Sequence, residues 1–278
     1  MTKDATGQSI ERFAGILRTL ADHQEEGARL TDIVAATGLS KSTVHRILHN
    51  LAQQGLVEQP SGSTAFYLSF EMFALGAAAA NRYGLVDLAR PHLVELERRC
   101  NDTIYLSSRS GAEAICIDRV EGGYPIKVLT LAVGDRRPLG AGAGSMALLS
   151  ALEDDEINEL LDHNRKSLDQ FIGFDPVRIW KLIRETREQG FAFNDGQIIP
   201  EMCAIAIPIP DSSGRPVASL SIAATAGRME PGRREQLIIW LREEVESLRL
   251  QLSRFRFNRH AKTAGDRRKR RIENDVHP

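Results

Sequence analysis

Apolar side chains recur at helical spacing in residues 38–51, with polar side chains of one kind between them. The apolar residues stand at i, i+3, i+4 and i+7, which predicts one buried stripe on a short helix: Val44, Ile47, Leu48 and Leu51. Ser40 is placed to cap this helix at its N-terminus, and Gly38 to end the element before it. The opposite face carries cations and hydroxyls without a carboxylate. Such a face suits phosphates and base edges, but a plain solvated helix fits the stretch equally well.

The segments on either side of residues 38–51 favour the DNA-binding interpretation. A first helix is predicted after a capping Ser9, and a short second helix runs from Thr31 to Gly38, so that two helices meet at a turn containing glycine. Residues 55–68 then contain two short β-prone runs around a Pro/Ser/Gly turn, which predicts a β-hairpin. Three helices followed by such a wing are typical of a winged helix-turn-helix domain, predicted here for residues 1–68.

Residues 69–83 are predicted to form a linker helix. Ser69 can cap it, and its apolar stripe consists of aromatic and small side chains: Phe70, Phe73, Ala74 and Ala77. A narrow stripe of this kind allows a second helix to approach closely. We expect the helix either to pair with its counterpart in a dimer or to pack on its own domain, and the sequence leaves both arrangements open.

From residue 84 to residue 253 the pattern changes to β-prone runs interspersed with amphipathic helices. Strands are predicted at 103–108, 114–120, 127–131, 191–194, 203–209 and 217–224. Helices are predicted at 87–99, 154–161, 176–189 and 232–252. The Gly-rich loop Gly140–Ser145 leads into a further helix that ends at Ser150. Successions of strand, turn and strand indicate an antiparallel sheet, and the surrounding helices make this half an α+β domain.

Composition places the chain among ordinary globular proteins. Its 278 residues are enough for two domains, and no apolar run approaches the roughly 20 residues of a membrane span. The N-terminus has no signal-peptide pattern, so we expect a cytoplasmic protein without a membrane partner. Cys100, Cys116 and Cys203 are an odd number of cysteines without a CxxC pair. This argues against a disulfide framework or a cysteine zinc site and favours buried free thiols.

The net charge of −1 conceals an uneven distribution. Residues 254–278 hold nine lysines and arginines against three acidic residues, whereas residues 1–82 hold seven against eight. The basic run could touch nucleic acid, but basic termini are more often disordered and solvated, which is our expectation for 254–278. The DNA-binding domain itself is not net basic. We therefore expect one copy to bind weakly, and affinity to depend on a local patch and on dimerisation.

Taken together, these segments resemble the IclR family of bacterial transcriptional regulators from Ser9 to about Leu252. The most specific similarities lie in Gly38–Arg46 with Gly55–Val57, in Ala89–Leu93, in Asp118–Gly122 and in Pro138–Leu139. The resemblance implies an N-terminal winged helix-turn-helix, a linker helix and a C-terminal GAF-like α/β effector-binding domain. It also implies a dimer or dimer of dimers on a partly palindromic double-stranded DNA operator, and regulation by a small-molecule effector, commonly an organic acid.

Site residues follow from the resemblance by position. The implied DNA contacts are Ser40, Lys41, Ser42, Thr43, His45 and Arg46. Arg46 is the best candidate for a guanine or phosphate contact, and Lys41 for a phosphate contact. The implied effector-binding residues are Ile126, Leu129, Gly142, Ala143, Asn194 and Ser221. The Gly142-Ala143 peptide would hold a carboxylate, since a glycine-rich loop that enters a helix presents free N–H groups at the positive end of the helix dipole.

Enzymatic alternatives rest on weaker patterns. The loop 140–145 lacks the Gly-Lys-Ser/Thr ending of a phosphate-binding loop, and no third metal ligand accompanies His45 and His49. Cys116 lies inside a predicted strand, and no serine sits in a Gly-x-Ser-x-Gly elbow. We therefore expect no catalytic residue, metal or cofactor. The alternative function is an enzyme that acts on a small organic acid with the N-terminal domain as a tether, and it would need a positioned acid, base or metal.

Overall fold

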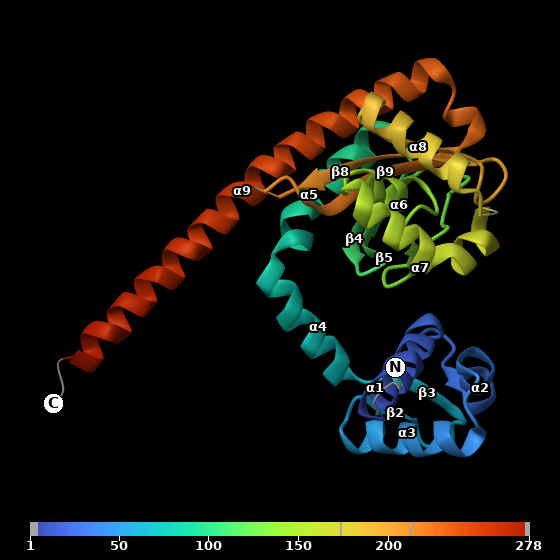
Figure 1. Ribbon diagram of the computed structural model, residues 1–278, viewed down its shortest axis with the longest axis vertical. Helices are drawn as coiled ribbons and strands as arrows, with labels where there is room; N and C mark the ends of the chain where they lie inside the picture. Colours follow the sequence, from blue (N-terminus) through green and yellow to red (C-terminus); the bar gives the residue numbers. More distant parts are fainter. Residues whose placement is uncertain (1–4, 173, 212, 276–278) are drawn as a thin grey trace. The chain divides into compact units, whose positions relative to one another are not determined.

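The computed structural model describes the backbone of residues 5–172, 174–211 and 213–275. Side chains are described for residues 7–79, 84–171, 174–211 and 213–253. The chain divides into two units, Met1–Gly84 and Leu85–Pro278, and each is described here by itself (Figure 1). Among the described residues, no helix is both long enough and apolar enough to cross a membrane.

The N-terminal unit is a three-helix bundle with a small sheet, as the sequence predicts. Its first elements are α1 (Ala5–Asp22), α2 (Leu30–Thr37), α3 (Lys41–Gln53), β1 (Ala28–Arg29), β2 (Val57–Glu58) and β3 (Ala65–Leu68). The strands form an antiparallel sheet in the order β1-β3-β2, so the predicted hairpin is confirmed and gains a third strand from the segment before α2. The prediction that Ser9 caps the first helix is wrong, because α1 begins at Ala5 and Ser9 lies within it.

Helix α3 owes its position to the predicted apolar stripe. All four residues of the stripe are buried and pack against Ile16, Leu20 and Ile33 of the neighbouring helices. A fully buried aliphatic side chain contributes about 1.5–3 kcal/mol relative to an exposed one, so the stripe fixes which face of α3 points to solvent. The ends also form as predicted. Gly38 adopts φ 66° after α2, and the Ser40 hydroxyl accepts a hydrogen bond from the Thr43 backbone N–H at 3.3 Å.

Helix α4 (Phe70–Tyr83) follows β3 and leaves its apolar stripe uncovered. The Phe70 and Phe73 side chains are 78% and 66% exposed, with ring centroids 5.4 Å apart. The stripe therefore does not pack on its own domain, which was one of the two arrangements left open. Ser69 does not cap the helix as expected; its hydroxyl donates to the Gly55 carbonyl instead and ties the helix start to the end of α3.

The C-terminal unit is built on one six-stranded antiparallel sheet, which confirms the predicted α+β class. Its strands are β4 (Thr103–Ser110), β5 (Glu113–Val120), β6 (Arg136–Pro138), β7 (Ala192–Asp195), β8 (Met202–Pro210) and β9 (Pro216–Thr225). They lie in the order β6-β5-β4-β9-β8-β7. The strand predicted at 127–131 is wrong: this segment is a loop, because the Tyr105 hydroxyl donates to the Val128 carbonyl and accepts from the Thr130 N–H.

Helices cover both faces of this sheet (Figure 1). They are α5 (Leu85–Cys100) and α9 (Pro231–Asp275) on one face, and α6 (Ala143–Ser150), α7 (Asp154–Ile172) and α8 (Pro176–Gln189) on the other. The alternation along β8 shows how the sequence builds two cores. Ile205 and Ile207 pack toward α5 and α9, whereas Ala206 between them packs toward α6. The small residue leaves α6 close to the sheet.

Helix α9 continues beyond the predicted end at residue 252. We expected a disordered tail from residue 254, but the backbone is helical as far as Asp275. The physical reason lies in composition, since Arg, Lys and Ala are good helix formers and the only proline of this segment is Pro278. Side chains after residue 253 lie outside the described ones.

Candidate DNA-binding helix and effector pocket

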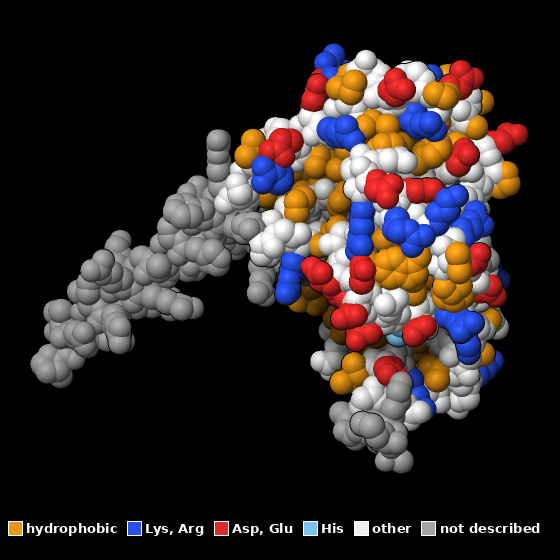
Figure 2. Space-filling model, turned by 45° about the horizontal axis from the view of Figure 1, so that its top comes forward, with side chains coloured by type: hydrophobic (Ala, Val, Ile, Leu, Met, Phe, Trp, Pro, Cys, Tyr) orange, Lys and Arg blue, Asp and Glu red, His pale blue; other side chains and the backbone are white. Residues whose placement is uncertain are grey.

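The solvent face of α3 carries exposed basic side chains, and its buried face packs on the neighbouring helices. Lys41, His45 and Arg46 are all exposed, and among the described side chains no acidic group forms an ion pair with Lys41 or Arg46. By contrast, basic and acidic side chains are interspersed on the face shown in Figure 2. A helix that presents unpaired cations and no carboxylate can neutralise phosphates and reach base edges, which most surface helices cannot do.

The three hydroxyls at the start of α3, those of Ser40, Ser42 and Thr43, have different roles. The Ser40 Oγ lies 2.8 Å from the Thr43 Oγ1 and 3.1 Å from the Ser42 Oγ, besides capping the helix. Thr43 is half-buried, whereas Ser42 is exposed. Ser40 and Thr43 therefore stabilise the N-terminus of α3. Ser42 is the hydroxyl best placed to reach a phosphate. The six predicted DNA contacts lie together at the N-terminal end of α3, with Ser40 as its cap.

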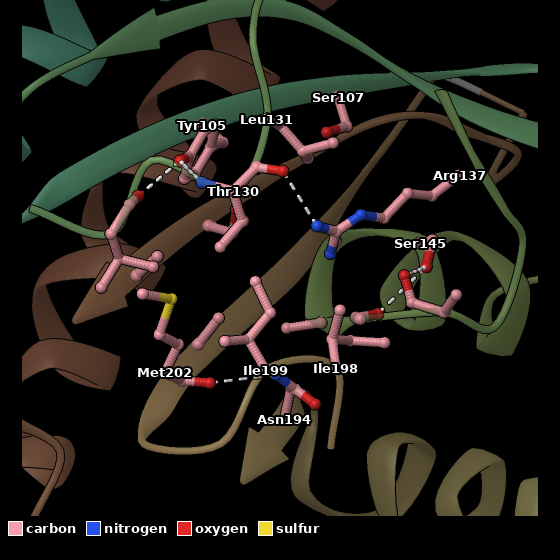
Figure 3. A pocket seen from close by; sticks show the side chains of 18 of the residues that line it. Tyr105, Ser107, Thr130, Leu131, Arg137, Ser145, Asn194, Ile198, Ile199 and Met202 are labelled. Atoms are coloured by element: carbon pink, nitrogen blue, oxygen red, sulfur yellow. Dashed lines mark hydrogen bonds between the residues drawn. The ribbon is translucent and has the colours of Figure 1, made fainter. Parts of the chain in front are cut away.

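A cavity of about 60 Å³ opens between the sheet and the start of α6 in the C-terminal unit (Figure 3). Its polar lining residues are Tyr105, Ser107, Thr130, Arg137, Ser145, Asn194 and Ser221. Its apolar lining includes Val128, Leu131, Ala143, Ile198, Ile199 and Met202. Of the six predicted effector-binding residues, the structure brings four together at this cavity: Gly142, Ala143, Asn194 and Ser221.

Ile126 and Leu129 are not among the residues that line the cavity, and their role in effector binding stays a prediction. Their side chains are 60% and 45% exposed, whereas Val128 is buried against Tyr105 and lines the cavity in their place. Residues 127–131 form a loop here, not the predicted strand. The Tyr105 hydroxyl holds the backbone on either side of Leu129, which turns the Leu129 side chain outward.

The Gly-rich loop forms the end of the cavity nearest α6. Gly142 precedes the helix with φ 91°, a conformation that favours glycine, and the helix runs from Ala143. The first intrahelical bond is donated by the Met146 N–H to the Gly142 carbonyl, so the preceding N–H groups have no acceptor within the helix. The Ser145 hydroxyl does not compete for them, because it donates back to the Ala141 carbonyl at 2.6 Å. The loop is thus a ready anion site.

Arg137 is the lining residue that sequence reasoning missed. In the short edge strand β6, Arg136 and Arg137 point to opposite sides: Arg136 pairs with Glu113 at 3.0 Å, while Arg137 lines the cavity. The Arg137 Nη2 donates to the Thr130 carbonyl at 3.0 Å. Burial is the largest influence on this guanidinium and lowers its pKa. The only signal in the sequence was its position directly before Pro138-Leu139.

The cysteines behave as buried free thiols, as predicted. None is in a disulfide, and burial raises the pKa of both Cys100 and Cys116 to about 11. A thiol with so high a pKa is protonated at neutral pH and is a poor nucleophile. Among the described residues, no group of three or more His, Cys, Asp and Glu side chains is close enough to hold a metal ion.

A winged helix-turn-helix with a cationic recognition helix, joined to a separate α+β domain that contains a pocket, defines a DNA-binding transcriptional regulator. Comparison with known proteins narrows this class. The family model for the IclR helix-turn-helix domain matches residues 9–61, and that for the bacterial transcriptional regulator IclR C-terminal matches residues 77–250. The chain therefore belongs to the IclR family of bacterial transcriptional regulators.

Individual relatives span nearly the whole chain. The HTH-type transcriptional regulator KipR of Bacillus subtilis is 29% identical over 81% of this chain and 88% of its own length. A crystal structure of a transcriptional regulator from Rhodococcus sp. RHA1 has a TM-score of 0.68 at 26% identity, covering 88% of this chain and 98% of that one. An IclR homolog from Microbacterium hydrocarbonoxydans, solved in complex with 4-hydroxybenzoate, has a TM-score of 0.71 at 20% identity, covering 87% and 98%.

Proposed function

We propose that this regulator binds a partly palindromic operator as a dimer or dimer of dimers and that a small organic acid in the pocket of its C-terminal unit changes this binding. The observation that carries the proposal is the exposed face of α3, with Lys41, His45 and Arg46 unopposed by any carboxylate of that helix. Such a helix enters the major groove with its N-terminal residues at the base edges. The regulator acts where the chromosome lies, in the cytoplasm.

Pairing of two copies is supported by the weakness expected of one. Residues 1–82 carry no net positive charge, so one recognition helix supplies few phosphate contacts. The exposed stripe of α4, led by Phe70 and Phe73, offers a surface for a second copy of the same helix. A dimer would place two α3 helices about 34 Å apart, one turn of DNA, and would read two half-sites.

Effector control is supported by the cavity beside α6. A ligand shifts DNA binding only when it binds more tightly to one of two arrangements of the regulator than to the other. The glycine-rich loop at Gly142 offers free N–H groups to a carboxylate. The Microbacterium homolog named above was solved with 4-hydroxybenzoate, itself a carboxylate, which is consistent with an acid as effector here.

The proposal is tested on the DNA upstream of the regulator's own gene. We expect the purified protein to bind this fragment at moderate, fixed salt with an affinity at least ~10³-fold above that for a shuffled fragment of equal length. Fluorescence anisotropy or gel shift measures both affinities, with and without a panel of small organic acids. Equal affinity for the two fragments under every condition would sink the proposal.

Ser221 provides a test of the pocket. We expect Ser221→Ala to weaken the response to whichever acid alters operator binding by about 1 kcal/mol, the usual contribution of one hydrogen bond, and to leave acid-free operator affinity unchanged. The matched control is Ser110→Ala, the same change at an exposed position at the end of β4. Titration of the operator complex with the acid measures both variants. Identical titrations for wild type and Ser221→Ala would remove Ser221 from the site.

A further inference from the structure

Hydrogen-bond donors from four separate elements converge on the cavity beside α6. Arg137 comes from β6, Ser107 from β4 and Ser221 from β9, and the free N–H groups come from the first turn of α6 (Figure 3). Ser107 and Ser221 are 5% and 6% exposed, and both line the cavity. A hydroxyl on a cavity wall can donate a hydrogen bond to a ligand and accept one from it.

Arg137 is the charged residue among those that line the cavity, and no Asp or Glu accompanies it there. It donates one hydrogen bond to the Thr130 carbonyl, and the centroid of the Phe171 ring is 6.0 Å away. The Asp135 carboxylate acts on it electrostatically but forms no ion pair with it among the described residues. Its neighbour Arg136 shows the usual arrangement, in which an arginine pairs with a carboxylate, Glu113. A desolvated guanidinium without a carboxylate partner is costly, and a bound anion would remove that cost.

The Arg137 guanidinium and the N-terminus of α6 lie against the same part of the cavity, beside Gly142. A Cβ atom built on Gly142 would lie 3.2 Å from the Arg137 Nη1, so this nitrogen sits against the loop that leads into α6. One carboxylate can therefore accept from Nη1 and from the first N–H groups of α6 together. Charge-assisted bonds of this kind are about twice as strong as neutral ones.

The remaining walls limit what else the ligand can be. The cavity has polar as well as apolar walls. Ser221 and Asn194 line it as well, and Asn194 is 8% exposed with only a long 3.4 Å bond to the Met202 carbonyl. These groups suit a second, neutral polar substituent, and the apolar lining suits a short carbon chain.

We infer that Arg137 is the counter-ion that makes this pocket select monocarboxylates with a second, uncharged polar group, of which a 2-hydroxy acid is the simplest. The inference rests on the proposed function only in taking this cavity as the effector site. A second carboxylate has no cation to receive it among the lining residues, and a neutral analogue leaves Arg137 unpaired. Arg137 thus determines the charge of the ligand.

Isothermal titration calorimetry on the full chain tests this directly. L-lactate, glycolate and pyruvate are the anionic probes, L-lactamide is the neutral probe of L-lactate's shape, and malonate carries the second carboxylate. We expect at least one monocarboxylate to bind wild type about tenfold or more tighter than L-lactamide and malonate. Arg137→Gln should lose this preference, and Arg137→Lys should keep it with lower affinity. Arg136→Gln, the matched control, should bind as wild type does.

Thermal unfolding without ligand separates this role from a structural one. Because Arg137 is a desolvated charge without a carboxylate partner, Arg137→Gln should melt at or above the wild-type temperature while losing lactate binding. The inference is overturned if none of the three monocarboxylates binds wild type, if L-lactamide binds as tightly as they do, or if Arg137→Gln keeps the preference. Operator binding without acid is measured separately. If the protein binds an acid but not the operator, the proposed function is contradicted, whereas the role of Arg137 in acid binding is not.

Discussion

Replacing Asp102 with alanine is expected to lower the free energy of unfolding of the C-terminal unit by about 3 kcal/mol. Asp102 precedes β4, and its carboxylate is almost fully buried, with 2% of the side chain exposed. One carboxylate oxygen lies 2.7 Å from the Arg228 Nε, and the other lies 2.6 Å from the Arg233 Nη2. The two arginines come from the segment before α9 and from its first turn, so Asp102 ties the start of α9 to the sheet.

The size of this effect follows from what the carboxylate leaves behind. Both guanidiniums also donate to the Cys100 carbonyl, and Arg228 stacks 4.0 Å from the centre of the Tyr124 ring, so neither can move away freely. The hydrogen bond to Asp102 raises the pKa of Arg228, so this group keeps its charge. Without Asp102 the guanidiniums of Arg228 and Arg233 would repel each other. Their side chains are 22% and 31% exposed, so water screens part of this repulsion. We therefore expect the lower end of the 3–5 kcal/mol range for broken buried pairs.

Urea unfolding followed by circular dichroism measures this destabilisation. The control is Asp154→Ala, because Asp154 also pairs with an arginine, Arg187, at 2.8 Å but is 65% exposed. Exposed pairs contribute at most about 1 kcal/mol, so the control should change little. A decrease below about 1 kcal/mol for Asp102→Ala would show that the buried cluster contributes no more than a surface pair.

The sequence predicts the DNA-binding half well because its signals are local. The stripe of α3, its Ser40 cap and the Gly38 turn all lie within a few residues of one another, and each is confirmed. Position along the helix alone then decides that Lys41 and Arg46 face solvent. Ser9 shows the limit of such signals, since a capping residue type also occurs inside helices and the true start of α1 lies four residues earlier.

The pocket could be predicted only in part, because distant residues shape it. The Gly-rich loop and the start of the helix after it can both be predicted from a short stretch of sequence, residues 140–150. By contrast, whether residues 127–131 form a strand or a loop depends on a hydroxyl more than 20 residues away, that of Tyr105. Arg137 looks like any surface arginine in the sequence. Its position depends on the pairing of β6 with β5. This pairing places Arg136 beside Glu113, and Arg137, on the opposite side of the strand, therefore points into the cavity.

The cations on α3 should differ in what they contribute to DNA binding. Lys41 stands at the first position of the helix, where a flexible ammonium reaches a phosphate, and Arg46 lies in the second turn with a planar fork suited to guanine. Phosphate contacts act on all sequences alike. Base contacts distinguish the operator from other DNA. The lysine and arginine variants should therefore separate affinity from specificity.

Arg46→Ala is expected to weaken operator binding by about 1–3 kcal/mol per half-site while leaving non-specific binding nearly unchanged. Lys41→Ala should weaken both and reduce the salt slope by about 1 for each phosphate that is no longer neutralised. Anisotropy titrations against operator and shuffled DNA at several salt concentrations measure these quantities. Arg18→Ala, the same charge change on the exposed side of α1, is the control. If Arg46→Ala binds the operator like this control at every salt concentration, α3 is not the element that reads the bases.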